Sequence, residues 1–165
     1  MKILKYPHPF LFEKVKAVTT FDESLDDLGK EMLETMHANN GVGLAANQVG
    51  VNKRIFVMKC ATDKPAYVFI NPVVVTKSLE CESQDEGCLS VPSIYAPVER
   101  AKIVTLSWQD TKGQTHEKSF DGLESVCVQH EIEHLDGIVF LQKLPPTRKT
   151  MAINKYAQYR KKNKD

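Results

Sequence analysis

Apolar residues recur at the helical period after Asp22 and stop before Asn40 and Gly41. The apolar positions of this segment are Leu25, Leu28, Met32, Leu33 and Met36. Residues three or four apart share one face of a helix, so these side chains form a stripe that a core can bury. The Asp22 side chain can accept a hydrogen bond from a backbone N–H of the first turn. We predict a helix that begins after Asp22 and ends near Asn40.

Four later segments have the character of β-strands, and the first two are rich in Val, Ile, Phe and Tyr. They cover residues 54–60, 67–77, 103–108 and 116–120. The last two flank the turn-like sequence Asp110-Thr111-Lys112-Gly113, which indicates a hairpin.

A second helix is predicted after these strands. Asp121, followed by Glu124 three residues later, has the pattern of a capping box, and Gly137 is a plausible end for the helix. Pro145-Pro146 then separates a last helix from the body. Segregated strands and helices predict an α+β fold: antiparallel or mixed sheets packed around a central helix, with a C-terminal helix. The length of 165 residues predicts a single domain over 1–165 that can bury a core.

The composition is that of a globular protein, with 42% hydrophobic and 26% charged residues. No basic-then-apolar leader and no apolar run of membrane-spanning length occurs in the sequence. Its four cysteines form no C-x-x-C pair, which favours reduced thiols in a cytoplasm over a disulfide framework. We therefore expect a cytoplasmic monomer without a membrane partner.

The net charge of +1 hides an asymmetry along the chain. Residues 147–165 contain seven basic residues and one acid, a charge of +6, whereas the rest contains 15 basic and 20 acidic residues, a charge of −5. A basic C-terminal helix over 147–165 could contact RNA or another polyanion. A solvated helix with a lysine-rich end is an equally good interpretation of the composition.

The strongest chemical signal is the H-E-x-x-H motif from His130 to His134, inside the second predicted helix. Positions i and i+4 share a helix face, so both imidazoles can bind one metal ion. Glu131 can reach water on that ion without being a ligand. Cys127 and Leu123 are spaced to share the His130 stripe, and buried imidazoles there need partners. A shared metal ion supplies them.

Two histidines leave a catalytic metal site one protein ligand short. Cys127 lies three residues before His130 and shares its face, but one straight helix has difficulty presenting three ligands around one ion. Cys88 lies in the glycine-containing segment 86–90, which can bring its backbone close to the site. Spacing alone leaves both cysteines open as the third ligand.

Three motifs occur in order: Gly41-Val42-Gly43-Leu44-Ala45-Ala46-Asn47-Gln48, Glu86-Gly87-Cys88-Leu89-Ser90 and Gln129-His130-Glu131-Ile132-Glu133-His134. Together with the start of the chain, Ile3 to Pro7, they resemble the signature motifs of peptide deformylases. The resemblance implies a metal ion held by Cys88, His130 and His134. It implies Fe²⁺ as that ion, with Ni²⁺, Co²⁺ or Zn²⁺ able to substitute.

The resemblance further implies a hydrolase that removes the N-formyl group from the N-terminal formylmethionine of nascent polypeptides and releases formate. Glu131 would take a proton from the attacking water and pass it to the departing amine. The Gln48 amide and the Leu89 backbone N–H would stabilise the oxyanion. N-formylmethionyl peptides would bind at Val42, Gly43, Glu86, Gly87, Leu123, Val126 and Cys127. The basic C-terminal helix would contact the ribosome or its RNA.

Two alternatives use the same helix motif. A zincin-like metallopeptidase shares it but lacks an evident third ligand downstream. A purely structural metal site requires a fourth Cys or His ligand, and none with suitable spacing is apparent. Within the motif, Glu133 stands where the family usually has Asp, and we expect it to pair with Arg100. Asn47 and Tyr95 also differ from commoner family residues.

Overall fold

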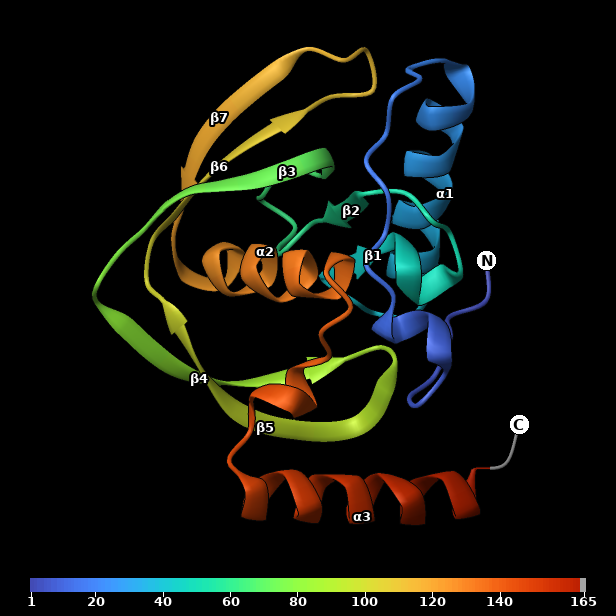
Figure 1. The fold of residues 1–165 in the computed structure, drawn as a ribbon, viewed down its shortest axis with the longest axis vertical. Helices are drawn as coiled ribbons and strands as arrows, with labels where there is room; N and C mark the ends of the chain where they lie inside the picture. The colour runs from blue at the N-terminus through green and yellow to red at the C-terminus, as the bar shows by residue number, and fades with distance from the viewer. Residues whose placement is uncertain (164–165) are drawn as a thin grey trace.

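The computed structural model describes residues 1–163 and has an α+β fold in which one helix lies at the centre (Figure 1). This helix, α2, is flanked on one side by a larger sheet and on the other by a two-stranded ribbon. The helices are α1 (Glu23–Ala38), α2 (Gly122–Leu135) and α3 (Pro146–Lys162), with 3₁₀ turns at Pro9–Phe12, Ala46–Val49 and Phe140–Lys143. In the described chain, no helix is long and apolar enough to cross a bilayer.

Both sheets are antiparallel. The five-stranded sheet has the order β1-β2-β3-β6-β7, so β1 and β7 are its edges. Its strands are β1 (Gly43–Ala45), β2 (Ile55–Met58), β3 (Tyr67–Lys77), β6 (Val104–Gln109) and β7 (Thr115–Phe120). The ribbon pairs β4 (Cys81–Cys88) with β5 (Val91–Ala101). This arrangement confirms the predicted fold class.

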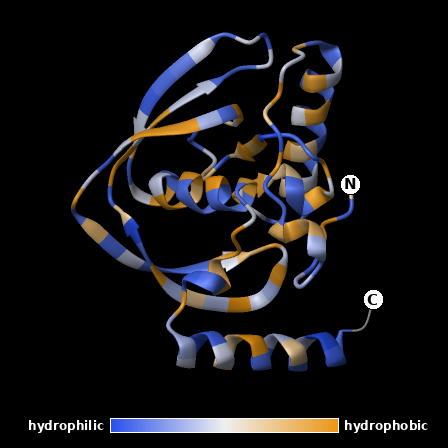
Figure 2. Cartoon of the chain, in the orientation of Figure 1, coloured by the Kyte–Doolittle hydropathy of each residue, from blue (hydrophilic) through white to orange (hydrophobic). Residues whose placement is uncertain are grey.

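Three apolar clusters hold these elements together. One lies between the five-stranded sheet and α2 and includes Phe56, Phe69 and Val128. A second joins β5 to α3 through Ala152 and Tyr156, and a third packs α1 against β2. Figure 2 shows hydrophobic residues around α2 and β2, and hydrophilic ones toward the outer end of the β6–β7 hairpin and the C-terminal end of α3. The clusters place the metal-motif helix in the interior.

The predicted ends of the first helix are confirmed. The Asp22 carboxylate accepts a hydrogen bond from the Ser24 N–H at 3.0 Å, and α1 ends at Ala38. Asn40 follows with a φ of 57°, in the left-handed region where a helix cannot continue. The predicted stop at Gly137 is also confirmed, because its φ of 79° suits glycine just beyond the end of α2.

Two local predictions need correction. Asp121 precedes α2, but its side chain makes no capping hydrogen bond, so the predicted capping box is wrong. Glu124 is buried instead and lies 3.9 Å from Lys64 Nζ. Strands β1, β4 and β5 were not predicted. β4 is almost entirely exposed and polar, so its pairing with β5 leaves no apolar pattern in the sequence.

Candidate metal centre

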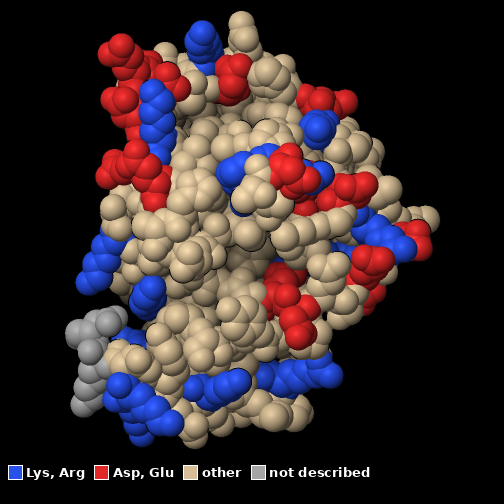
Figure 3. Space-filling view, turned by 180° about the vertical axis from the view of Figure 1, so that it is seen from behind, with Lys and Arg blue, Asp and Glu red and all other residues tan. Residues whose placement is uncertain are grey.

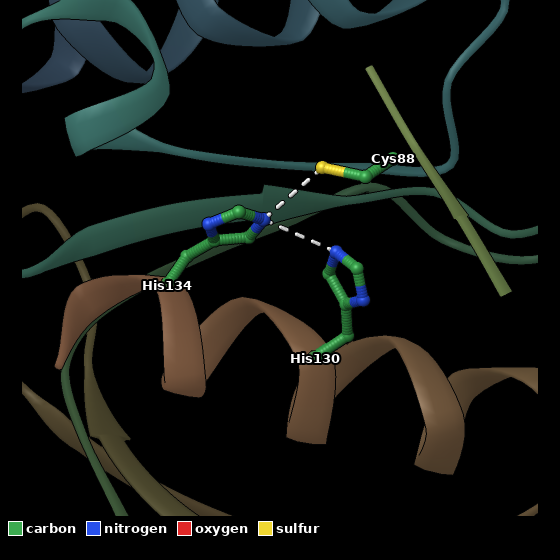
Figure 4. Close-up of side chains that lie close together, drawn as sticks. All are labelled: Cys88, His130 and His134. Atoms are coloured by element: carbon green, nitrogen blue, oxygen red, sulfur yellow. Dashed lines mark hydrogen bonds between the residues drawn. The ribbon is translucent and has the colours of Figure 1, made fainter. Parts of the chain in front are cut away.

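Three metal-ligating side chains from two parts of the chain meet beside α2. His130 and His134 lie one turn apart on α2, and Cys88 is the last residue of β4. The Nε2 atoms of the histidines are 3.2 Å apart, and Cys88 Sγ lies 3.2 Å from His134 Nε2. Figure 4 shows the three side chains pointing toward one another. Their donor atoms lie within 4.8 Å of one another, and residues 1–163 contain no second group of this kind.

Cys127, the other candidate for the third ligand, has a different neighbour. Its Sγ lies 3.8 Å from the Val42 carbonyl oxygen, on the wall between α2 and β1. Cys88 reaches the histidines because the β4–β5 ribbon folds back over α2. The tertiary structure therefore brings Cys88, and not Cys127, to the two imidazoles.

A chain of charged groups fixes the orientation of His130. Its Nδ1 lies 2.8 Å from a Glu86 oxygen, so the imidazole can donate there and present Nε2 to an ion. Both Glu86 oxygens also accept hydrogen bonds from Arg100, at 2.7 and 3.0 Å. Arg100 in turn pairs with Glu133, which confirms the predicted contact, and Glu133 lies 2.8 Å from Lys143 Nζ.

The electrostatic environment suits a cation. Burial lowers the pKa of His130, but the negative groups around it, Glu131, Cys88 and Glu86, outweigh burial and raise that pKa well above its usual value. Burial lowers the pKa of His134 well below its usual value, so this imidazole is neutral and keeps a lone pair for a metal ion. Burial also raises the pKa of Glu86, yet its hydrogen bonds from His130 and Arg100 hold the net pKa below the ordinary range.

These residues fit a single divalent metal ion. One thiolate and two imidazoles, with an open fourth position, form a donor set used by catalytic zinc and iron-group metals. His130 has the oriented, hydrogen-bonded second nitrogen typical of metal ligands. All three donors are buried or half-buried, where a shared ion offsets the cost of removing them from water.

Glu131, next to His130 in the chain, also lines the cavity. It is buried, and its Oε1 has no hydrogen-bond partner among the described residues. Burial raises its pKa to about 7, despite the opposing effect of His130. A buried carboxyl group with a free oxygen and a pKa near neutrality is suited to receive and return a proton.

Gln48 lies next to Cys88. Its Oε1 accepts from the Ala45 N–H at 2.9 Å, which fixes the amide orientation. Its Nε2 donates to Ser90 Oγ at 3.1 Å and lies 3.4 Å from Cys88 Sγ. The adjacent Leu89 accepts from Lys5 Nζ through its carbonyl at 3.1 Å. The amide donor of Gln48 thus faces the same space as the candidate ligands.

A cavity of about 840 Å³ opens beside the metal centre. Val42 and Leu123 are 39% and 48% exposed, whereas Val126 and Cys127 are buried. The cavity wall includes every residue that was expected to bind substrate, namely Val42, Gly43, Glu86, Gly87, Leu123, Val126 and Cys127. The Glu86 carboxylate is hydrogen-bonded to His130 and Arg100. It therefore supports the candidate metal ligand His130.

Several cavity residues have no signal in the sequence. Tyr156, Tyr159 and Arg160 of α3 line the cavity, more than 60 residues from the Cys88 motif. Nothing in the sequence indicates this, because α3 reaches the cavity by packing on β5. Ser90 belongs to the Glu86–Ser90 motif, but only the structure shows its hydrogen bond with Gln48.

The fold and site together define a class: a mononuclear metal-dependent hydrolase with a thiolate among its ligands. The zincin-like alternative expected a third ligand downstream of the histidines, whereas the ligand that the described residues supply, Cys88, lies upstream. A purely structural site would be closed, but His130 and Cys88 line an open cavity. Neither alternative fits these two observations.

Comparisons with known proteins agree on one family. The sequence model of the family described as "Polypeptide deformylase" matches residues 1–150. A peptide deformylase of Zymomonas mobilis is 40% identical over 172 residues, and the match covers 100% of this chain and 97% of the relative. Peptide deformylase 2 of Xanthomonas campestris is 43% identical over 165 residues, and the match covers 98% of this chain and 96% of the relative. A crystal structure of a Legionella pneumophila peptide deformylase superposes with a TM-score of 0.93 at 39% identity, covering 98% of this chain and 96% of that one.

The chain belongs to the polypeptide deformylase family. This family consists of hydrolases that remove the N-formyl group from nascent peptides. The resemblance drawn from the three sequence motifs is confirmed.

Proposed function

We propose that this chain hydrolyses the formamide of N-formylmethionyl peptides, with Cys88, His130 and His134 holding one Fe²⁺ ion. The observation that carries the proposal is the convergence of these donors beside Glu131 and an open cavity. A divalent ion held there would act as a Lewis acid and lower the pKa of water toward about 7. Ni²⁺, Co²⁺ and Zn²⁺ suit the same donors and are expected to substitute.

Glu131 is proposed as the proton carrier. Its unpartnered Oε1 is free to accept a proton from the attacking water. The same carboxyl group then donates that proton to the amine that leaves as the C–N bond breaks, so formate and a free N-terminus result. Burial favours this double use because neither protonation state of Glu131 is strongly preferred near neutral pH.

Gln48 and Leu89 are proposed to stabilise the oxyanion. The Gln48 Nε2 group is held by the Ala45 contact and lies next to Cys88. The Leu89 N–H follows Cys88 directly in the chain. Fixed donors of this kind gain strength in a site that excludes water.

The substrate is proposed to bind as an extended strand. β1 is an edge of the five-stranded sheet, so its free side can pair with a peptide near Val42 and Gly43. Gly87 also lines the cavity, near the end of β4. The methionine side chain would lie against Leu123, Val126 and Cys127, where polarisable sulfur suits it.

We further propose that the chain works in the cytoplasm as a single-domain monomer over 1–165 and meets the ribosome through the basic helix. The described part of that helix, α3, carries exposed basic residues toward solvent (Figure 3). Residues 164 and 165, the end of the expected 147–165 segment, lie outside the described residues.

Metal analysis and product analysis of anaerobically purified protein test the proposal together. We expect one iron per chain and release of formate from a formyl-Met peptide, with no cleavage of an internal peptide bond. The acetylated peptide of the same sequence serves as the matched control and should stay intact. Cleavage of the internal bond, or no formate from metal-replete protein, would refute the proposed reaction.

A further inference from the structure

Two cysteines, Cys60 and Cys127, lie at the wall of the proposed methionine pocket. Cys60 follows the end of β2 and packs against the apolar cluster that contains Cys127 of α2. Both are free thiols, and the two side chains interact with each other. Neither belongs to the group of candidate metal ligands.

The backbone holds this pair in place. Lys59, next to Cys60, donates its N–H to the Val42 carbonyl at 2.9 Å. Cys127 Sγ lies 3.8 Å from the same carbonyl oxygen. The end of β2, the residue before β1 and the middle of α2 therefore meet at the Val42 carbonyl, which places Cys60 and Cys127 beside the same point of the apolar cluster.

The two thiols have different environments. Cys60 is half-buried, whereas Cys127 is buried. The hydrogen bond with Cys127 lowers the pKa of Cys60, against the effect of burial, and the Lys64 charge acts in the same direction as that hydrogen bond. The same contact and full burial raise the pKa of Cys127 well above its usual value. Because the thiolate is the reactive form, Cys60 is the sulfur that an oxidant meets first.

We propose that Cys60 and Cys127 form a reversible disulfide when the protein meets a hydroperoxide, and that this bond impairs methionine-peptide binding. The effect on catalysis rests on the proposed role of Cys127 in the substrate pocket. Cys127 Sγ lies on the wall next to Gly43, so a movement of the sulfur toward Cys60 alters the pocket.

The oxidation balances in two steps. The Cys60 thiolate attacks the terminal oxygen of the hydroperoxide, an S–O bond forms, the O–O bond breaks, and the departing alkoxide (hydroxide for hydrogen peroxide) takes up a proton to become an alcohol (or water). Cys127 then loses its proton as its sulfur attacks the Cys60 sulfenic acid, the S–S bond forms, the S–O bond breaks, and the hydroxyl group leaves with a proton as water. Two thiols are oxidised and one hydroperoxide is reduced.

The test uses the nickel-loaded full chain, which avoids oxidation of ferrous iron. After treatment with stoichiometric hydrogen peroxide, a non-reducing digest should contain the Cys60 and Cys127 peptides joined, lighter by two hydrogen atoms, and dithiothreitol should separate them. In the same sample, kcat/KM for a formyl-Met peptide should fall about tenfold because KM rises. It should recover with dithiothreitol.

Two variants provide the controls. Cys60→Ser should form no linked peptide and keep its activity after peroxide, whereas Cys81→Ser, which removes an exposed thiol elsewhere, should behave like the parent. Absence of the linked peptide in the parent, or equal loss of activity in Cys60→Ser, would overturn the disulfide. A linked peptide with unchanged KM would overturn its effect on binding. If untreated protein releases no formate, the proposed function fails, while the peptide masses still decide the disulfide.

Discussion

At the scale of one residue, Gly43 lies in a part of the cavity wall that has no space for a side chain. A Cβ at this position would lie 2.6 Å from both Cys127 Sγ and Glu131 Oε2. Both contacts are shorter than real Cβ atoms tolerate, so any larger residue must displace the pocket wall or the proposed base. Glycine is therefore required here for space.

The ligand assignment leads to a direct prediction at the same scale. Cys88→Ala removes the thiolate from the two-histidine group, and we expect the purified variant to retain less than one tenth of the parent's metal. Cys127→Ala should bind metal like the parent, because its sulfur faces Val42 instead of the histidines. Elemental analysis after gel filtration measures both. The reverse pattern would show that the assignment is wrong.

Glu131→Ala separates metal binding from proton transfer. Glu131 lies next to His130 in the chain but is not one of the three converging donors, so metal content should stay unchanged. Loss of the proton carrier should reduce kcat by about 10²–10⁴-fold. Steady-state release of formate from a formyl-Met peptide gives this number. A variant with parental kcat would remove Glu131 from the mechanism.

Gln48→Glu tests the oxyanion donor with little structural change. The new carboxylate can still accept from the Ala45 N–H, but it lacks the Nε2 donor. We expect kcat to fall about 10²–10³-fold while the protein remains folded. Circular dichroism and formate release should be measured on one preparation. Ser90→Ala is the matched control, since it removes a neighbour of the amide without removing the donor.

At the scale of elements, Arg100 links the β4–β5 ribbon to α2. Its side chain is 4% exposed and pairs with Glu86 on β4 and Glu133 on α2. Arg100→Met would leave the buried Glu86 charge without its arginine partner, with only the His130 contact remaining, and we expect a loss of about 3–5 kcal/mol in the free energy of unfolding. Urea denaturation of the metal-free protein measures it without the contribution of metal binding.

Lys102→Met is the control for this experiment. Lys102 lies two residues away and pairs with Glu80 and Glu82, but these carboxylates are largely exposed. Pairs of this kind contribute about 0–1 kcal/mol. Equal losses in both variants would show that the buried network does not hold the ribbon to the helix.

The elements also show where sequence patterns predict structure and where they fail. The helical period after Asp22 and the β-rich segment 67–77 correspond to α1 and β3, because each buries an apolar face of its own. β4 escaped prediction because its side chains are polar and its stability comes from β5. The capping box is absent because the Asp121 side chain makes no capping hydrogen bond, and Glu124 lies 3.9 Å from Lys64 Nζ, far away in sequence.

At the scale of the whole molecule, basic side chains are concentrated along α3. Figure 3 shows basic side chains in a row where α3 lies, and acidic side chains gathered over α1. Truncation of α3 would be a poor test of its surface, because Ala152 and Tyr156 are buried against β5. Substitutions on the exposed face leave that packing intact.

Reversal of the exposed charges Lys155, Lys161 and Lys162 to Glu should weaken ribosome binding. Each lost phosphate contact should reduce the slope of log affinity against log salt by about 1. Hydrolysis of a short formyl-Met peptide should remain unchanged, since these lysines do not line the cavity. Reversal of three exposed lysines elsewhere serves as the control: Lys2, Lys14 and Lys30. Equal effects of both triple variants would indicate general charge repulsion instead of a contact through α3.

The sequence by itself determined the local chemistry of this protein. The i, i+4 spacing of His130 and His134 places both imidazoles on one helix face, because the helical period is a property of neighbouring residues. Spacing left the choice between Cys88 and Cys127 open, and there the family resemblance supplied the assignment.

The tertiary structure decided which distant side chains meet. It brings Cys88 to the histidines, Arg100 to Glu86 and Cys60 to Cys127. Each of these contacts depends on how the ribbon and the sheet pack on α2. That packing is set by apolar clusters whose residues come from distant parts of the chain. Such long-range contacts leave no periodic pattern along the sequence, so periodicity and spacing alone could not reveal them.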